Sequence, residues 1–465
     1  MKIIIEIIYL VSSILFIFGI KQLSSPKTAR NGNFLSSLGM FIAIVVTLFD
    51  QHVMTYEYIL IGLVIGSGIG LLFAYKTPMT GMPQMVGLLN GFGGGASMLV
   101  ALSEFYKMKN FDVFSHELST DVSVVLSIFI GAVTFTGSLI AFGKLQGIVT
   151  GKVVKYPLQN TINIILIISI LLGGAYFAIY NPTLDWIILS ISLVALILGV
   201  LLVLPIGGAD MPVAISLLNS YSGIAGSMTG FVLKNNELII AGALVGASGI
   251  ILTMIMCKGM NRSLMNVVLG GWESAGTVSA PSSESSAKGS VKSVDSEELA
   301  MIFDSASNIV IVPGYGMAVA QAQHAVRDLV NLLESKGKNV RFAIHPVAGR
   351  MPGHMNVLLA EAQVSYEKMF AMEDINDDFN NTDIAFIIGA NDVVNPAARH
   401  DKNSPIYGMP ILNVDYAKTV VINKRSMNAG YAGIDNELFF YPNALMYFGD
   451  SKDAVNKLVH ELKNI

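Results

Sequence analysis

Charged residues are scarce in this sequence. Asp, Glu, Lys and Arg make up 13% of the 465 residues, about half of the roughly 25% that an average soluble protein carries. Only 22 of them precede residue 261, so the first part of the chain is about 8% charged and the remainder about 20%. This split excludes a single soluble globule and a disordered chain, and it favours a membrane domain followed by a water-soluble one.

Cysteine and an excess of basic charge are also missing. The single Cys257 cannot form an internal disulfide, which excludes a secreted disulfide scaffold, and its place at the end of an apolar run favours a packing role. A formal net charge of −4 offers no basic face for nucleic acid. His345, His354 and His400 lack metal-ligand spacing, so no metal is expected.

Long apolar stretches are abundant in the first part. We expect about nine membrane-spanning helices, because nine stretches have about the necessary length: Ile3–Ile20, Phe34–Phe49, Tyr58–Tyr75, Gln84–Ser103, Val122–Gly143, Asn160–Tyr180, Leu184–Leu204, Pro212–Leu233 and Leu238–Cys257. The first stretch carries Glu6 and lacks a small-residue cleavage site, so it is interpreted as a retained span rather than a signal peptide.

The loops between these stretches differ in their content of Lys and Arg. Odd-numbered loops hold seven such residues and even-numbered loops hold three. Because basic loops remain on the cytosolic side, we expect a multi-pass protein of the cell (inner or plasma) membrane with its N-terminus outside. The predicted organisation is a transmembrane domain over residues 1–260, a flexible Ser-rich linker over 261–295 and a cytoplasmic domain over 296–465.

Three polar residues of the membrane part invite a functional interpretation. Asn90 and Asn219 lie inside spans, where a carboxamide needs a partner from another helix or from water in a polar path. Asp210 lies in a short loop before Pro212, on the predicted cytosolic side. It could be the N-cap of the next helix, a carboxylate at the mouth of a polar path, or both. No histidine falls inside a span.

The soluble part alternates strands with helices. Strands are expected at Asn308–Val312, Val340–His345, Asp383–Ile388, Ile411–Val414, Thr419–Ile422 and Ala444–Phe448, with helices over Met317–Ser335 and from Ser451. Such alternation predicts a Rossmann-like α/β domain, in which a parallel sheet is covered on both faces.

The ends of the predicted strands indicate a dinucleotide. Gly314 and Gly316 follow the first strand and resemble a dinucleotide-binding turn at a helix N-terminus, which attracts a pyrophosphate. The second strand ends at His345 without the acid that would bind the ribose of NAD, and Arg350 follows it. Lys424–Arg425 follows another strand. Cations at strand ends suit a 2′-phosphate and favour NADP, although a solvated basic pair is the alternative.

About 170 residues build one nucleotide-binding domain and leave nothing for a second, so a hydride taken from NADPH must pass to something bound on another chain. Longer motifs then make the chain recognisable. Val347–His354, Gly389–Pro396 and Lys424–Gly433, with Pro205–Pro212 and Leu217–Gly223 in the membrane part, resemble the beta subunit of proton-translocating NAD(P) transhydrogenase, and the resemblance runs essentially from end to end.

The resemblance implies an activity and its partners. A separate alpha subunit would bind NAD(H), while this chain would supply membrane helices and a cytosolic NADP(H) domain. Hydride transfer from NADH to NADP⁺ would be coupled to inward proton movement, in a dimer of heteromeric units within the lipid bilayer. NADP(H) would be bound in the reverse orientation from most such folds, and no metal or nucleic acid would take part.

The resemblance also implies site residues. The NADP(H) site would comprise Gly314, Tyr315, Gly316, Val347, Ala348, Gly349, Arg350, Met351, Pro352, Gly389, Ala390, Asn391, Asp392, Val393, Gly408, Met409, Lys424, Arg425, Ser426, Met427, Asn428, Ala429, Gly430 and Tyr431. Lys424, Arg425 and Ser426 would meet the 2′-phosphate, and Tyr431 would close over the nucleotide.

Asp392 would sense the state of the nucleotide and Asp210 would face it from the membrane side, with Asn90 and Asn219 also taking part in the coupled reaction. Some family members carry His at the position of Asn90. Since Asn cannot exchange a proton near pH 7, either a partner subunit supplies the titrating His or water and Asp210 carry the step.

Two other functions compete with this interpretation. One is an ion transporter or channel gated by a cytosolic dinucleotide-sensing domain, and the other is a membrane quinone reductase. The sequence contains no pore-filter motif and no recognisable flavin or quinone site, so the transhydrogenase is preferred.

Overall fold

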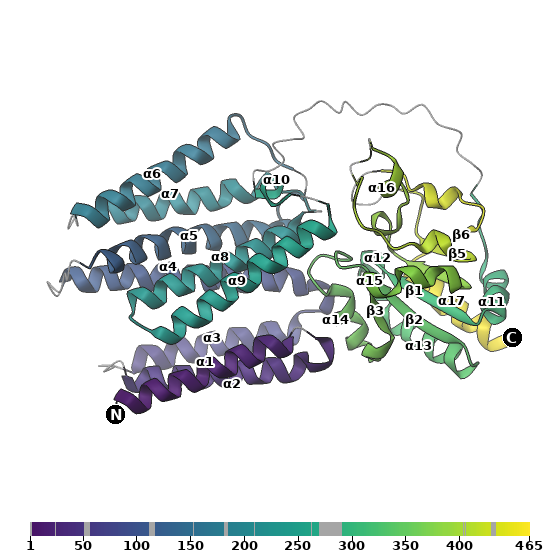
Figure 1. The fold of residues 1–465 in the computed structure, drawn as a ribbon, viewed down its shortest axis with the longest axis horizontal. Coiled ribbons are helices and arrows are strands. Elements are labelled where there is room, and N and C mark those ends of the chain that lie inside the picture. The colour runs from purple at the N-terminus through teal and green to yellow at the C-terminus, as the bar shows by residue number, and fades with distance from the viewer. Residues whose placement is uncertain are drawn as a thin grey trace. The chain divides into compact units, whose positions relative to one another are not determined.

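The structure is a computed structural model that describes residues 2–23, 25–50, 56–110, 117–151, 153–180, 185–208, 210–261, 263–268, 291–402, 404, 406–428 and 434–465. Its contacts divide the chain into two compact units (Figure 1). The first comprises Met1–Thr253 with Val267–Gly270, and the second Met254–Asn266 with Gly271–Ile465.

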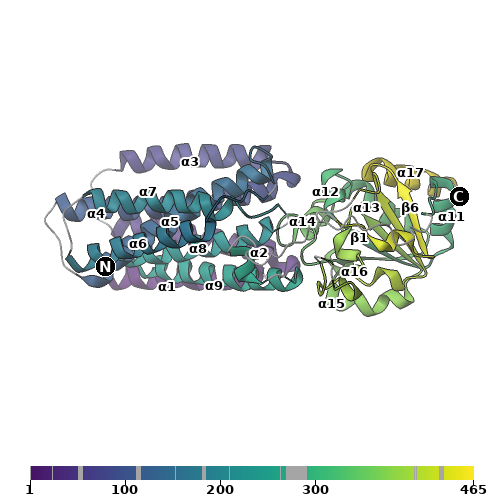
Figure 2. The same ribbon diagram turned by 90° about the horizontal axis from the view of Figure 1, so that it is seen from above.

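Long helices that run side by side build the first unit (Figures 1 and 2). Its described residues form α1 (Lys2–Leu23), α2 (Pro26–Asp50), α3 (Glu57–Lys76), α4 (Met82–Asn110), α5 (Leu118–Gln146), α6 (Gln159–Tyr180), α7 (Asp185–Val203), α8 (Met211–Val232) and α9 (Asn236–Gly259). Eight of these are long and apolar enough to cross a membrane, which confirms the prediction of a polytopic helical domain. The ninth, α8, has spanning length but carries the polar run Asn219–Ser222.

The helix α5 lies at the centre of this unit and packs against α4, α7 and α8. Small residues set the separations between helices. A Cβ atom added to Gly94 of α4 would lie 2.7 Å from the Thr134 Cβ of α5, and one added to Gly223 of α8 would lie 2.3 Å from the Gly246 nitrogen of α9. By contrast, α3 has no buried residue and runs along the outside of the bundle (Figure 2).

A six-stranded sheet forms the centre of the second unit. The strands are β1 (Asn308–Pro313), β2 (Asn339–Ile344), β3 (Met369–Ala371), β4 (Ile384–Ile388), β5 (Thr419–Lys424) and β6 (Ala444–Phe448). They lie in the order β3-β2-β1-β4-β5-β6, and every neighbouring pair is parallel. In register, Ile309 of β1 faces Val340 of β2 and Ile384 of β4. The predicted α/β domain with a parallel sheet is confirmed.

Both faces of the sheet are covered. Side chains alternate along a strand, so Val310 and Val312 join a core with α15 (Met372–Ile375), η4 (Asn376–Asn381) and η7 (Glu437–Phe440). On the other face, α11 (Ser296–Ser305), α13 (Gln323–Ser335) and α17 (Ser451–Asn464) pack together, and Phe303 of α11 meets Phe386 of β4 edge to face at 5.4 Å. The remaining short elements are η1 (Met79–Gly81), α10 (Leu264–Val268), α12 (Tyr315–Val319), α14 (His354–Glu361), η3 (Tyr366–Lys368), η5 (Asp392–Val394), α16 (Ala397–His400) and η6 (Val414–Tyr416).

The single helix predicted over Met317–Ser335 was wrong, because the chain forms α12 and α13 with a break between them. At the break, Gln321 adopts a left-handed conformation with φ of +50°. The Gln321 N–H donates to the Ala318 carbonyl and the Ala322 N–H to the Met317 carbonyl, the pattern of a Schellman motif. Glycine usually occupies this position, so the sequence held no stop signal.

The strand predicted at Ile411–Val414 was also wrong. The Leu412 N–H donates to the Val393 carbonyl at 3.0 Å. The Asn376 side chain accepts from the Asn413 N–H at 2.9 Å and donates to the Ile411 carbonyl at 2.9 Å. These backbone groups are therefore satisfied outside the sheet, although Ile411 and Leu412 are buried.

Most of the predicted linker, residues 269–290, lies outside the described residues. Its described end adds to the open edge of the sheet. The Val294 N–H donates to the Met446 carbonyl at 3.0 Å and the Met446 N–H to the Lys292 carbonyl at 2.8 Å, so the chain joins the second unit by pairing with β6.

Candidate functional site

The carboxyl edge of the sheet gathers the loops that carry the predicted nucleotide-binding residues. The strand order reverses between β1 and β4, and open α/β sheets bind ligands at this edge, beside such a switch point. The turns after β1, β2, β4 and β5 all begin at this edge, because the strands are parallel and their carboxyl ends lie together. Residues from four separate sequence motifs are thereby brought to one edge.

The turns after β1 and β4 interlock without side chains between them. The Gly314 N–H donates to the Ile388 carbonyl and the Gly316 N–H to the Gly389 carbonyl, each at 2.9 Å. A Cβ atom on Gly314 would lie 2.4 Å from the Gly389 oxygen, and one on Gly389, whose φ is +67°, would lie 2.4 Å from the Gly316 Cα. Only glycine permits this approach.

This arrangement gives the glycine turn a structural role. The N–H groups of Gly314 and Gly316 donate to the carbonyls of Ile388 and Gly389, so they join the two turns, and the predicted contact of these glycines with a nucleotide stays a prediction. The helix that follows, α12, has five residues. The two glycines thus hold the turns of the switch point together.

The turn after β2 contacts the β1 turn through aromatic and cationic side chains. The Arg350 guanidinium lies 4.3 Å from the centroid of the Tyr315 ring, and the His354 ring lies 6.3 Å from it. The Arg350 N–H donates to His354 Nδ1 at 3.1 Å. Gly349, with φ of +104°, closes this turn, and a Cβ there would lie 2.5 Å from that same nitrogen.

Both histidines of this region are neutral near pH 7. Burial lowers the pKa of His345 to about 4. Burial and the charge of Arg350 lower the pKa of His354 to about 4. His345 Nε2 donates to the Pro410 carbonyl at 2.8 Å, and its Nδ1 accepts from the Val347 N–H at 3.3 Å. His345 therefore ties two loops together and offers no positive charge to a phosphate.

A polar network joins the ends of β4 and β5. Lys424 Nζ donates to Asn391 Oδ1 at 3.3 Å and to the Asn428 carbonyl at 2.8 Å. Asn391 Nδ2 donates to Asp392 Oδ1 at 3.1 Å, and Asn436 Nδ2 donates to the Asn391 carbonyl at 3.0 Å. Burial lowers the pKa of Lys424, and the carboxylate of Asp392 opposes this shift. The predicted phosphate-binding lysine and the predicted sensor carboxylate thus share one network.

The loop after β5 faces solvent. Arg425, Ser426, Met427 and Asn428 are exposed, and Ser426 Oγ accepts from the Asn428 N–H at 3.4 Å. This loop can offer a guanidinium and a hydroxyl to an anion. Ala429, Gly430 and Tyr431, predicted to bind and cover the nucleotide, lie outside the described residues.

Other predicted residues form an apolar floor beside this network. Val347, Val393 and Met409 belong to one cluster with residues such as Ile406. Gly408 precedes Met409 in a left-handed conformation with φ of +77°. Ala348 and Ala390 are buried, whereas Met351 and Pro352 are half-buried. These residues shape and pack the site rather than supply charge.

In the membrane unit, the two predicted asparagines lie beside neighbouring positions of α5, and so at a similar height along that helix. Asn90 Nδ2 donates to Ser138 Oγ of α5 at 3.0 Å. At the adjacent position of α5, a Cβ on Gly137 would lie 3.1 Å from Leu218, the neighbour of Asn219 on α8. Among the residues that the structure describes, the Asn219 carboxamide has no hydrogen-bond partner. Sequence reasoning missed Ser138, because nothing local distinguishes it from other span serines.

Asp210 occupies the N-cap position of α8, which was one of the two interpretations of this residue, but its side chain makes no capping hydrogen bond. Its backbone carbonyl accepts the first hydrogen bond of the helix, from the Ala214 N–H at 3.1 Å. Along the axis of α8, Asp210 and Asn219 are separated by about 13 Å, at 1.5 Å per residue. Within the described ranges, no group of His, Cys, Asp and Glu is arranged to hold a metal ion.

Comparisons with known proteins agree with this geometry. Residues 5–461 match the model of the family described as NAD(P) transhydrogenase beta subunit. Two proteins named NAD(P) transhydrogenase subunit beta, from Rhodospirillum rubrum and from a designated strain of that species, are each 50% identical to the chain over 457 residues. The match covers 98% of this chain and 98% of each relative.

Proposed function

Because the chain belongs to the NAD(P) transhydrogenase beta subunit family, we propose that it is the NADP(H)-binding and membrane subunit of a proton-translocating transhydrogenase. The single observation that carries this proposal is the union, in one chain, of apolar spanning helices and a β3-β2-β1-β4-β5-β6 parallel sheet with a cationic carboxyl edge. An alpha subunit that binds NAD(H) would complete the enzyme.

The residues at the sheet edge fit NADP(H). The interlocked glycines leave a flat, side-chain-free switch point, and the exposed Arg425 and Ser426 stand beside Lys424 to receive a 2′-phosphate. Bound NADP(H) would supply the hydride chemistry, and the chain would bind it, orient it and exclude water. The asparagines, glycines and Arg350 would position its remaining parts.

The polar network offers a way for nucleotide binding to be sensed. Lys424 donates to Asn391, which donates to Asp392. A phosphate that draws the Lys424 ammonium away from Asn391 would change the surroundings of the Asp392 carboxylate. We propose that this carboxylate couples nucleotide state to proton movement, and that Asp210, Asn90 and Asn219 act on the membrane side.

The driving force is sufficient for such coupling. Moving one charge across ~200 mV releases about 4.6 kcal/mol, enough to displace a nucleotide equilibrium by about three decades. The content of Lys and Arg in the loops supports a cytoplasmic location for the nucleotide domain. Because Asn90 cannot titrate, the partner subunit or water with Asp210 would carry the proton at mid-membrane. We further propose a dimer of heteromeric units in the bilayer of the cell membrane.

Reconstitution with the partner subunit in vesicles tests the proposal. Reduction of NADP⁺ by NADH and the pH of the lumen would be followed together, and the two should change in step. Asp392→Asn and Asp210→Asn should each slow proton-driven transfer. If both variants transferred hydride at the wild-type rate under a proton gradient, the assigned coupling would be refuted. Ion flux without any hydride transfer would support the transporter or channel gated by a dinucleotide, which the family match does not favour.

The 2′-phosphate site has its own test. Lys424→Met and Arg425→Met should each weaken NADPH binding by about 10-fold to 100-fold, since a hydrogen bond to a charged group contributes roughly 1.5–3 kcal/mol. NADH, which lacks the phosphate, should bind as weakly as before. Lys457→Met, at an exposed lysine of α17, is the control. Equal losses of affinity for NADPH and NADH would show that the two cations do not bind the 2′-phosphate.

A further inference from the structure

Lys144 is a buried cation at the end of α5. Its residue is 6% exposed, and its ammonium donates to the Leu204 carbonyl at 2.5 Å and to the Ile206 carbonyl at 2.7 Å. Both carbonyls follow the last residue of α7, Val203. Carbonyls at a helix end lack intrahelical partners, and leaving them unpaired in an apolar interior is costly.

These carbonyls begin the loop that ends at Asp210. The loop has a second attachment, because the Gly208 N–H donates to the Gly151 carbonyl at 3.0 Å. Between the Lys144 contacts and the start of α8 stand Gly207 and Gly208, and the Asp210 N–H turns back onto the Gly207 carbonyl at 3.1 Å. Lys144 therefore holds the first part of the loop, and backbone hydrogen bonds hold Gly208 and Asp210 further along.

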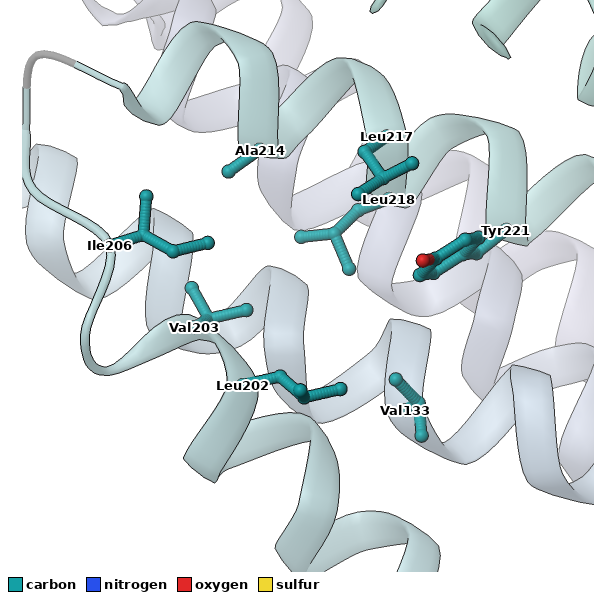
Figure 3. A pocket seen from close by; sticks show the side chains of 8 residues that line it. All are labelled: Val133, Leu202, Val203, Ile206, Ala214, Leu217, Leu218 and Tyr221. Carbon is teal, nitrogen blue, oxygen red and sulfur yellow. The ribbon is translucent and has the colours of Figure 1, made fainter. Parts of the chain in front are cut away.

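Apolar packing alone leaves room for the loop to shift. Ile206 borders a cavity of about 30 Å³ between α5, α7 and α8 (Figure 3). The cavity is lined by Val133, Leu202, Val203, Ile206, Ala214, Leu217, Leu218 and Tyr221. Because seven of these eight side chains are apolar, the cavity offers few partners to water. It gives the Ile206 side chain space on one side, so hydrogen bonds rather than packing hold the start of the loop. Those of Lys144 are joined by one from the Val154 N–H, which donates to the Leu204 carbonyl at 3.4 Å.

We propose that Lys144 is a positioning residue for proton coupling. Its ammonium attaches the start of the α7–α8 loop to α5, the helix whose Ser138 bonds Asn90. It thereby holds Asp210 at a defined height relative to the polar level in the membrane. The role of Lys144 in proton coupling rests on the proposed function. The attachment of the loop by its hydrogen bonds does not, and it can be tested separately.

The test uses the complete enzyme in lipid nanodiscs and vesicles. Lys144→Met removes the donors and the charge, and Lys144→Arg keeps both. Lys155→Met, at an exposed lysine beyond α5, is the matched control. Hydrogen exchange of the Ile206, Gly208 and Asp210 amides reports the attachment, and the rate of hydride transfer driven by a proton gradient reports the coupling.

Lys144→Met should speed exchange of these amides by about 10-fold or more, the scale of one lost hydrogen bond to a charged group. It should lower the proton-driven rate about 10-fold while the NADPH affinity stays unchanged. Lys144→Arg should restore both, and Lys155→Met should alter neither.

Unchanged exchange in Lys144→Met would overturn the attachment. Faster exchange with an unaltered proton-driven rate would overturn the role in coupling, as would an equal loss in Lys144→Arg. If the wild-type enzyme transferred hydride without moving protons, the proposed function would fail, and the exchange measurements would still decide whether Lys144 holds the loop.

Discussion

Gly389→Ala tests whether the close approach of two turns at the switch point requires glycine. Two costs combine at this position. An L-residue at φ of +67° is strained by roughly 1–2 kcal/mol. The added Cβ would also lie 2.4 Å from the Gly316 Cα and 2.5 Å from the Met317 nitrogen, and forcing such overlaps apart costs typically 1–3 kcal/mol. The substitution should therefore destabilise the second unit by about 2–5 kcal/mol.

Gly337→Ala separates the two costs. Gly337 has φ of +79°, and a Cβ there would meet nothing within 4 Å. Gly337→Ala should therefore lose only roughly 1–2 kcal/mol of stability, because conformational strain is its one cost. The overlap alone then predicts that Gly389→Ala is the less stable variant by about 1–3 kcal/mol. Gly389→Ala should also weaken NADPH binding, because it moves the β1 and β4 turns apart, whereas Gly337→Ala should not.

Hydrogen exchange of β1 and β4 amides in the full chain measures the stability of the second unit. Gly389→Ala should speed their exchange by about 30-fold to several thousand-fold, since each 1.4 kcal/mol is tenfold. Gly337→Ala should exchange about 5-fold to 150-fold more slowly than Gly389→Ala by the same conversion. Equal exchange in the two variants would refute the reasoning, because strain without overlap would then explain both.

Two predictions concern pH. Hydrogen bonding to Lys418 and to two backbone N–H groups lowers the pKa of Asp383 to about 2 from an ordinary value of 3.8. The stabilisation is therefore present above pH 4 and is lost as the pH falls towards 2. In Asp383→Asn, the free energy of unfolding, measured by denaturation at each pH, should depend less on pH between 4 and 2. Burial lowers the pKa values of His345 and His354 to about 4 from 6.5, so the unfolded chain binds protons that the folded unit excludes. Stability should fall as the pH drops from 6.5 through 4. His354→Gln should reduce this slope by about one proton, and an unchanged slope would show that His354 is not buried neutral.

Some features of the site could be predicted from local sequence, and others could not. The glycines after β1, the cations after β5 and the asparagines inside spans stand out because their residue types are unusual in those settings. Ser138, Lys144 and Asn436 could not be predicted because their importance lies in partners 45 or more residues away, namely Asn90, Ile206 and Asn391.

The local sequence pattern also predicted two secondary-structure elements wrongly. The run Ile411–Val414 has the composition of a strand, but Asn376 and Val393 take its hydrogen bonds. The continuous helix expected over Met317–Ser335 breaks at Gln321, whose left-handed conformation is set by a Schellman pattern. In both cases a hydrogen-bond pattern that composition does not reveal overrides the local preference.

The sequence by itself determined the division into an apolar helical part and an α/β part, because apolar runs and β-branched strands act through local burial and need no particular partner. Only the tertiary structure decided how the ends of β1 and β4 interlock, which side chain accepts from Asn90, and which carbonyls Lys144 holds. Those outcomes depend on the directions of hydrogen bonds and on separations of a few ångströms between distant residues, and neither is encoded in the composition of a segment.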